Sequence, residues 1–216
     1  MSIEVTVADL SRMGLIELPW WYESRRGEFI EGLAQSSPAE VFFEVSCKHD
    51  RNEGPVILST WLDNLEWPCD TIDKANAYRS KFLRDVLADV WCLAEYPERY
   101  FPRRWWVDLF RDAGYPRPTK PLTIFRGATS SRRLGMSWTT SRERAEWFAQ
   151  RYIGETSAIN AYIYRTTVHP IWVLCRVDGA CQDGGRGEGE VVVEPLRLGK
   201  ITRHDVTSTK RGELTR

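Results

Sequence analysis

Two glutamates and two hydroxyl side chains in the C-terminal half of the chain have a spacing that suits a chemical site. Glu188 and Glu190 are two residues apart at the start of an apolar run, so in an extended chain both carboxylates face the same way. Nearby like charges raise the cost of ionising both groups, which lets a pair of carboxylates divide its roles. Ser137 and Thr139 are also two residues apart, so their hydroxyls share one face of a strand while Trp138 points the other way.

A third candidate is an arginine that follows a short apolar run. Leu122–Phe125 predicts a strand that ends at Arg126, and Gly127 follows it. At a strand end the guanidinium could leave the core and hold a diphosphate through two parallel charge-assisted hydrogen bonds. Taken singly, each piece also fits an ordinary surface: a solvated arginine, a strand followed by a helix cap, and two solvated glutamates at a loop edge.

In their order along the chain, these pieces resemble a known signature. Arg126-Gly127, Ser137-Trp138-Thr139 and Glu188-Gly189-Glu190 resemble the Arg, Ser-Thr-Ser and Glu-x-Glu motifs of the R-S-E class of ADP-ribosyltransferases. Two positions depart from the pattern, because Trp replaces the middle Thr and Thr replaces the last Ser. The resemblance covers residues 120–200. It implies an enzyme that cleaves the nicotinamide–ribose bond of NAD and transfers ADP-ribose to an acceptor, with NAD as co-substrate and no metal.

The resemblance implies a role for each residue. Arg126 and Gly127 would bind the dinucleotide, and Ser137, with Thr139, would orient Glu190 and the nicotinamide ribose. Glu190 would be the catalytic carboxylate. It would hydrogen-bond the ribose hydroxyl next to the anomeric carbon and stabilise the positive charge that develops there, as carboxylates do in glycosidases.

Two further roles follow from the same resemblance. Glu188 would orient or deprotonate the acceptor. Nicotinamide would need an aromatic wall, and Phe148, on the helix after the Ser motif, is a cofactor-binding candidate by position, beside Trp147 and Tyr152. The helical spacing of Phe148 and Tyr152 favours core positions for both residues.

The acceptor is left open between a protein arginine, a nucleic acid and a small molecule, and we expect a macromolecule, either protein or RNA/DNA. The Glu-x-Glu pair resembles the arginine-modifying branch. Residues 99–151, however, hold 12 Lys or Arg against 4 Asp or Glu, which suits binding to phosphates. Residues 178–189 contain five glycines and fit either the acceptor-recognition loop of the family or a plain flexible connector.

The family type implies a toxin, a phage-borne host modifier or an antiviral defence effector, with an inhibitory, antitoxin-like partner. Two rival functions stay open. An NAD glycohydrolase would send ADP-ribose to water. A non-catalytic module would carry Arg126 and the Glu pair as surface charges and would use its basic segment to bind a nucleic acid or an acidic protein.

The composition and the cysteine spacing bear on which classes of protein remain possible. The five cysteines lack C-x-x-C spacing and Cys47-Lys48-His49 is the one local Cys/His pair, so neither a disulfide framework nor a metal site is predicted. No apolar run approaches the ~18 residues of a membrane span, and the first ten residues lack a signal pattern. We therefore expect a reduced, cytoplasmic protein with no membrane partner. Ten tryptophans are many for 216 residues, and most should be core.

Periodicity predicts helices before a proline-rich linker at residues 116–121 and strands after it. Helices are predicted at Thr71–Glu95 and at Arg103–Asp112, the second stopped by Gly114, and a third helix should follow a capping box at Thr140–Glu143. Strands are predicted at Leu122–Arg126, Gly135–Thr139, Ile159–Val168, Ile171–Val177 and Glu190–Glu194.

The predicted fold class is α+β, with three parts. These are a mainly helical N-terminal lobe (residues 1–118), a β-rich NAD-binding catalytic core (residues 119–202) and a flexible tail (residues 203–216). The resemblance adds that the core should be an ADP-ribosyltransferase-like split mixed β-sheet, in which two packed, antiparallel-rich sheets hold NAD in the cleft between them.

Overall fold

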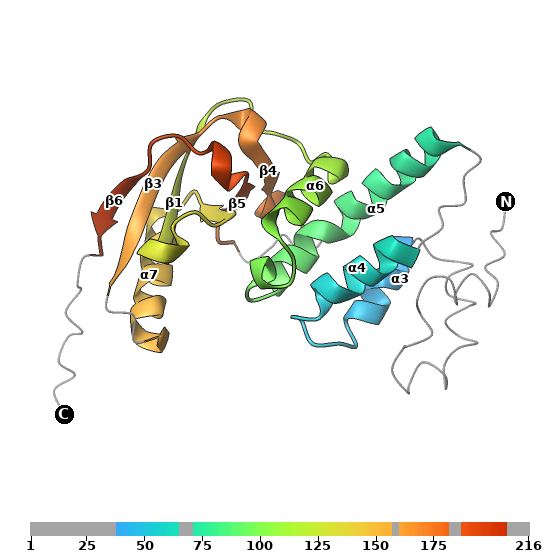
Figure 1. The fold of residues 1–216 in the computed structure, drawn as a ribbon, viewed down its shortest axis with the longest axis horizontal. Helices are drawn as coiled ribbons and strands as arrows, with labels where there is room; N and C mark the ends of the chain where they lie inside the picture. Colours follow the sequence, from blue (N-terminus) through green and yellow to red (C-terminus); the bar gives the residue numbers. More distant parts are fainter. Residues whose placement is uncertain (1–37, 65–70, 157–159, 182–186, 207–216) are drawn as a thin grey trace. The chain divides into compact units, whose positions relative to one another are not determined.

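The structure is a computed structural model that describes residues 38–64, 71–156, 160–181 and 187–206 (Figure 1). The chain divides into two compact units. The first comprises residues 1–115 together with 179–185, and the second comprises residues 116–178 together with 186–216. Within the described residues, no helix is both long and apolar enough to cross a membrane.

Helices form most of the described part of the first unit. In chain order they are α3 (Pro38–Ser46), α4 (Gly54–Asn64), α5 (Ile72–Leu93), the 3-10 helix η2 (Pro97–Arg99) and α6 (Arg103–Ala113). The two helices predicted from periodicity are confirmed. The Thr71 hydroxyl caps α5 by accepting a hydrogen bond from the Lys74 amide at 3.4 Å. Gly114 ends α6 with a φ of 63°, a left-handed conformation that costs glycine little.

Helix α4 was not predicted. Its sequence begins Gly54-Pro55, which as a dipeptide indicates a turn. Proline is nonetheless accepted in the first turn of a helix, where its missing amide has no partner to lose. The buried Leu58 and Trp61 then anchor the helix in the core of the unit, so tertiary packing decides the conformation of a segment whose local signals are ambiguous.

Aromatic side chains build the core of the first unit. Phe42, Trp61 and Phe82, from α3, α4 and α5, have ring centroids between 5.6 and 6.1 Å apart. Trp91 of α5 meets Trp106 of α6 edge-on at 5.2 Å. Such pairs stabilise a core beyond the burial of their area. The three tryptophans are buried, as the sequence predicts for most of the set.

The second unit contains an antiparallel sheet and one long helix, α7 (Arg142–Thr156). The strands are β1 (Leu122–Thr129), β2 (Ser137–Thr139), β3 (Ala161–Val168), β4 (Val173–Arg176), β5 (Glu190–Val193) and β6 (Thr202–Asp205). Their order in the sheet is β4-β5-β2-β1-β3-β6, and every neighbouring pair is antiparallel. Separate helices and an antiparallel sheet make the chain α+β, as expected (Figure 1).

The sheet differs from the expected two packed sheets, because all six described strands belong to one sheet. Its two halves are nevertheless joined narrowly. The pairing of β1 with β2 is recorded at a single position, Phe125 opposite Thr139, whereas β1 pairs with β3 over the whole of Leu122–Thr129. The short β2 therefore links two three-stranded halves at one place.

Strand β1 is longer than predicted, so Arg126 lies inside a strand and not at its end. The strand continues because Gly127 lets α7 approach it closely. A Cβ on Gly127 would overlap the Ala145 carbonyl oxygen and lie 2.5 Å from the Ala149 amide nitrogen. The glycine that suggested the end of a strand thus allows helix and sheet to pack together.

Helix α7 begins one residue later than the capping-box prediction. Ser141 is the cap, because its Oγ accepts a hydrogen bond from the Arg144 amide at 3.1 Å. The Thr140 hydroxyl, which was predicted to cap the helix, donates instead to the Gly189 carbonyl at 3.4 Å. The Thr140 amide donates to the same carbonyl at 2.9 Å, which holds this residue to the segment before β5.

The core of the second unit lies on the face of the sheet that carries Trp138. This side chain is 2% exposed and points into the core as predicted, and its Nε1 donates to the Gly135 carbonyl at 2.9 Å. The buried members of the cluster are apolar or aromatic: Ile124, Ala128, Trp138, Tyr164, Val168, Val173, Val191 and Val193.

The predicted flexible tail is wrong for its first residues. Residues 202–205 form β6, which pairs with β3 along Tyr162–Arg165. The Arg203 guanidinium lies 4.5 Å from the centroid of the Tyr162 ring. Polar side chains suit an edge strand, where one side of the strand has no partner. The rest of the predicted tail, residues 207–216, lies outside the described residues.

Candidate active site

Strands β2 and β5 place the predicted hydroxyls and a predicted carboxylate on one face of the sheet. Ser137 lies opposite Val192, and Thr139 lies opposite Glu190, in an antiparallel pairing. Because side chains alternate along each strand, Ser137, Thr139 and Glu190 share a face and Trp138 lies on the other. Residue spacing predicted that Ser137 and Thr139 share one face of their strand. The pairing of β2 with β5 places Glu190 on that same face.

A short hydrogen bond joins the serine to the glutamate. Ser137 Oγ donates to Glu190 Oε1 at 2.6 Å. The two residues are diagonal neighbours across the strand pair, which is within reach of a glutamate side chain. Both side chains are partly exposed. Ser137 therefore fixes the direction of a carboxylate that a ligand can still reach.

Arg126 reaches this group from β1. Its Nε donates to the Arg132 carbonyl at 3.1 Å, and its Nη1 donates to the Ser137 carbonyl. Gly135 makes room for the guanidinium, because a Cβ at that position would lie 2.8 Å from Nη1 and closer still to Nη2. The guanidinium therefore bridges β1 and β2 through the backbone carbonyl of Ser137.

The Thr139 hydroxyl is engaged by backbone groups. The residue is 4% exposed, and its Oγ1 donates to the Glu188 carbonyl at 2.6 Å and accepts from the Ser141 amide at 3.0 Å. These bonds join the end of β2 to the residue two before β5 and to the cap of α7. Thr139 thus positions Glu188 and the first turn of the helix.

Asp178 is a site residue that sequence reasoning missed. Its Oδ2 accepts a hydrogen bond from the Gly189 amide at 2.7 Å, which fixes the backbone between Glu188 and Glu190. Its Oδ1 is buried and has no hydrogen-bond partner within the described part of the chain. A buried acceptor without a partner is uncommon in folded proteins. The available signal was an aspartate directly before a glycine-rich segment, a residue type that often hydrogen-bonds nearby backbone.

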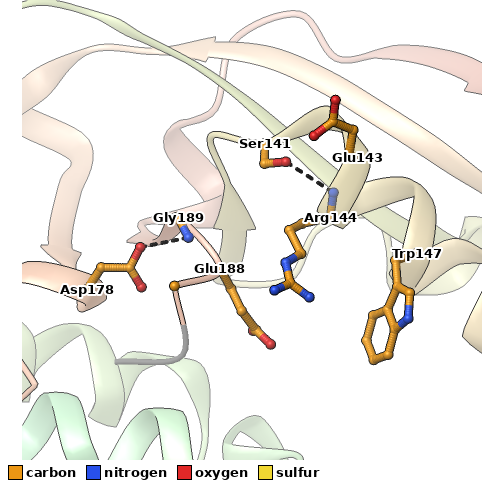
Figure 2. Close-up of a pocket in the computed structure, with 8 residues that line it drawn as sticks. Ser141, Glu143, Arg144, Trp147, Asp178, Glu188 and Gly189 are labelled. Carbon is orange, nitrogen blue, oxygen red and sulfur yellow. Dashed lines mark hydrogen bonds between the residues drawn. The ribbon is translucent and has the colours of Figure 1, made fainter. Parts of the chain in front are cut away.

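A pocket of about 570 Å³ adjoins these residues, which is within the usual range for small-molecule sites (Figure 2). It is lined from the start of α7 and from the segments on either side of the glycine-rich stretch: Ser141, Glu143, Arg144, Trp147, Asp178, Gly187, Glu188 and Gly189. Glu188 extends from the segment before β5, while Arg144 and Trp147 come from α7 (Figure 2). Trp147 is 47% exposed and offers an open aromatic surface.

Gly127 and Phe148 do not line this pocket, and neither do Arg126, Ser137, Thr139 and Glu190. Gly127 is buried beneath α7. Phe148 is half-buried, and its ring meets the Trp147 ring edge-on at 5.0 Å. An exposed aromatic surface was predicted at Phe148, but Trp147 is the residue that provides one. The side chain of Tyr152, the third aromatic residue considered, lies outside the described part of the chain.

The left-handed backbone before β5 allows a test of this geometry. Gly187 and Gly189 have φ values of 63° and 61°, but only Gly189 is crowded, since a Cβ there would lie 2.6 Å from Thr140 Oγ1. Gly187→Ala should lower the free energy of unfolding by about 1 kcal/mol and Gly189→Ala by about 3 kcal/mol, measured by urea denaturation. Equal losses in the two variants would contradict the contact with Thr140.

Comparisons with models of protein families, with curated proteins and with solved structures each gave no match for this chain. The function must therefore be argued from the α+β fold and from the residues that the sheet brings together.

Proposed function

We propose that the second unit is the catalytic part of an NAD-dependent mono-ADP-ribosyltransferase with an ADP-ribosyltransferase-like fold. One observation carries the proposal: three separate pieces of sequence meet at one place. Arg126 donates to the carbonyl of Ser137, 11 residues later, and the Ser137 hydroxyl donates to Glu190, 53 residues later again. An arginine, a serine and a glutamate are the groups that the resemblance assigns to NAD binding and catalysis.

Glu190 would act at the carbon from which nicotinamide leaves. As the bond from this carbon to the nicotinamide nitrogen breaks, the electron pair goes to nicotinamide and positive charge develops on the ribose. The Glu190 carboxylate stabilises that charge and accepts a hydrogen bond from the adjacent ribose hydroxyl. Because Ser137 Oγ already holds the carboxylate at 2.6 Å, little reorganisation accompanies the reaction.

The lining of the pocket favours a cationic acceptor over a phosphate. Glu143, Asp178 and Glu188 contribute three carboxylates, against the single guanidinium of Arg144. Trp147 adds an aromatic face, which attracts a planar cation. The excess of basic residues over 99–151 suggests a nucleic acid instead, and eight of the 12 basic residues, with two of the 4 acidic ones, belong to the second unit. The local charge is the better guide to the group that meets Glu188, so we favour a protein arginine.

The proposal is tested with NAD labelled on the adenylate phosphate, incubated with the purified protein and a cell lysate. Label in acid-insoluble material that protease removes and nuclease does not would support transfer to protein. The reverse pattern would support a nucleic-acid acceptor. Free labelled ADP-ribose alone would favour an NAD glycohydrolase, and unchanged NAD would favour a non-catalytic binding module.

Glu188→Gln should separate transfer from cleavage. The substitution keeps the shape of the side chain but removes the base that would take the acceptor's proton, so transfer should fall about 10²-fold, within the usual range for general-base loss. NAD cleavage should change much less, since Glu190 is untouched. The measurement follows labelled acceptor and free nicotinamide in the same reaction.

Glu143→Gln is the matched control, because Glu143 lines the same pocket from an exposed position on α7. It should leave cleavage unchanged and lower transfer much less than Glu188→Gln does, because it removes one carboxylate of the lining but not the proposed base. If transfer and cleavage fell together in Glu188→Gln, or if transfer persisted, Glu188 would not act on the acceptor.

A further inference from the structure

A cluster of three potential metal ligands lies in the first unit. Asp89 and Cys92 are three residues apart on α5 and so lie on one face of the helix. Cys181 belongs to the segment of residues 179–185, which is part of the same unit. One ligand atom from each residue lies within 4.8 Å of the others, and the two sulfur atoms are 3.3 Å apart.

The surroundings of the cluster favour a cation. Asp89 and Cys181 are each 8% exposed, and Cys92 is partly buried. A carboxylate and two thiols gathered away from water offer acceptor groups to a positive ion and supply no positive charge of their own.

We propose that Asp89, Cys92 and Cys181 bind a soft divalent cation such as Zn²⁺, through one carboxylate oxygen and two thiolates, with a further position left for water. Cysteine and aspartate are both ordinary ligands of zinc. The inference does not depend on the proposed transferase activity. It departs from the prediction of no metal, which considered only cysteines that are close in sequence.

The distances favour a metal over a disulfide. Two thiolates on a tetrahedral Zn²⁺ lie about 3.8 Å apart, given a Zn–S bond of about 2.3 Å. A disulfide needs a separation of about 2.05 Å. The observed 3.3 Å is nearer the metal geometry. A metal site would also use the Asp89 carboxylate as a ligand, whereas a disulfide would involve only the two cysteines.

A bound cation would restrain one end of the segment that leads to the candidate acid pair. Cys181 precedes Glu188 by seven residues in the sequence. The cation would hold Cys181 to α5, so the site would stabilise the first unit. The expected part is structural, and no metal takes part in the proposed chemistry.

The test is a titration of the full chain with Co²⁺ after reduction by a phosphine, which does not compete as a thiol ligand. We expect one equivalent to bind, with a thiolate-to-cobalt charge-transfer band and the intense visible bands of tetrahedral Co²⁺, both removed by Zn²⁺. Cys181→Ser should lose the charge-transfer band or shift it strongly, and Asp89→Asn should bind about tenfold more weakly.

Cys47→Ser is the control, because Cys47 is an exposed cysteine of the same unit and should not affect binding. Circular dichroism tests whether each variant is folded. If Cys181→Ser does not fold, the affinity of Asp89→Asn for Co²⁺ tests the proposal. Failure of the reduced parent protein to bind Co²⁺ would overturn the proposal, as would unchanged spectra in both site variants. Loss of binding capacity in Cys47→Ser would also overturn it, because the ligand would then lie elsewhere.

Discussion

The Glu190→Gln variant is expected to consume NAD about 10²- to 10³-fold more slowly than the parent protein while unfolding at the same temperature. Glutamine has the shape of glutamate and keeps an oxygen that can accept the hydrogen bond from Ser137 Oγ. It lacks the negative charge that must oppose the positive charge developing on the ribose. The rate of nicotinamide release and the thermal midpoint, measured on the same preparation, separate the two effects.

Glu194→Gln makes the same change of charge four residues later. The Glu194 side chain is 14% exposed, and its carboxylate lies 3.6 Å from Nε of Arg197. This control should turn over NAD at the parent rate. Unimpaired turnover in Glu190→Gln would remove Glu190 from the catalytic site. A parent protein that leaves NAD intact would favour the binding-module interpretation for the whole second unit.

Local signals predicted much of the helical unit. The apolar spacing along α5, the cap at Thr71 and the stop at Gly114 each depend on residues close in sequence, and the structure agrees with them to within two residues. Where a local signal conflicted with packing, packing prevailed. Gly54-Pro55 indicates a turn but opens α4, and Gly127 suggests a strand end but sits within β1.

The sequence identified individual residues of the candidate site, but it did not specify how the strands bring them together. Alternation along a strand gave the shared face of Ser137 and Thr139. The register that sets Thr139 opposite Glu190 is a long-range pairing that spacing alone does not specify. The contact of Arg126 with the Ser137 carbonyl also depends on how β1 and β2 separate after their single recorded residue pair. Residue spacing does not specify this separation.

The proposed metal ligands, Asp89, Cys92 and Cys181, were not predicted for a related reason. Metal motifs are identified in sequence by short spacings such as C-x-x-C, whereas Cys92 and Cys181 are 89 residues apart. Asp89 falls on the buried face of α5, where periodicity predicts an apolar residue. A charged residue at a core position of an amphipathic helix was the signal available, because such a residue needs a compensating partner.

Gly127→Ala is expected to lower the free energy of unfolding of the second unit by about 3 kcal/mol. The added Cβ would lie 2.5 Å from the Ala149 amide nitrogen and 3.0 Å from the Ala145 carbonyl carbon, and it would overlap the Ala145 carbonyl oxygen. These are backbone atoms, so no change of rotamer relieves the overlap and α7 must move off β1. Denaturant unfolding followed by the fluorescence of the tryptophans measures the loss.

Gly199→Ala is the matched control, since a Cβ on Gly199 meets nothing within 4 Å. Its stability should stay within about 0.5 kcal/mol of the parent. Moving α7 also displaces Ser141 and Trp147, so Gly127→Ala should reduce transferase activity through the pocket. If Gly127→Ala were as stable as Gly199→Ala and only its KM for NAD rose, Gly127 would contact the dinucleotide, as the resemblance implies. Loss of stability instead assigns this glycine to the packing of helix on sheet.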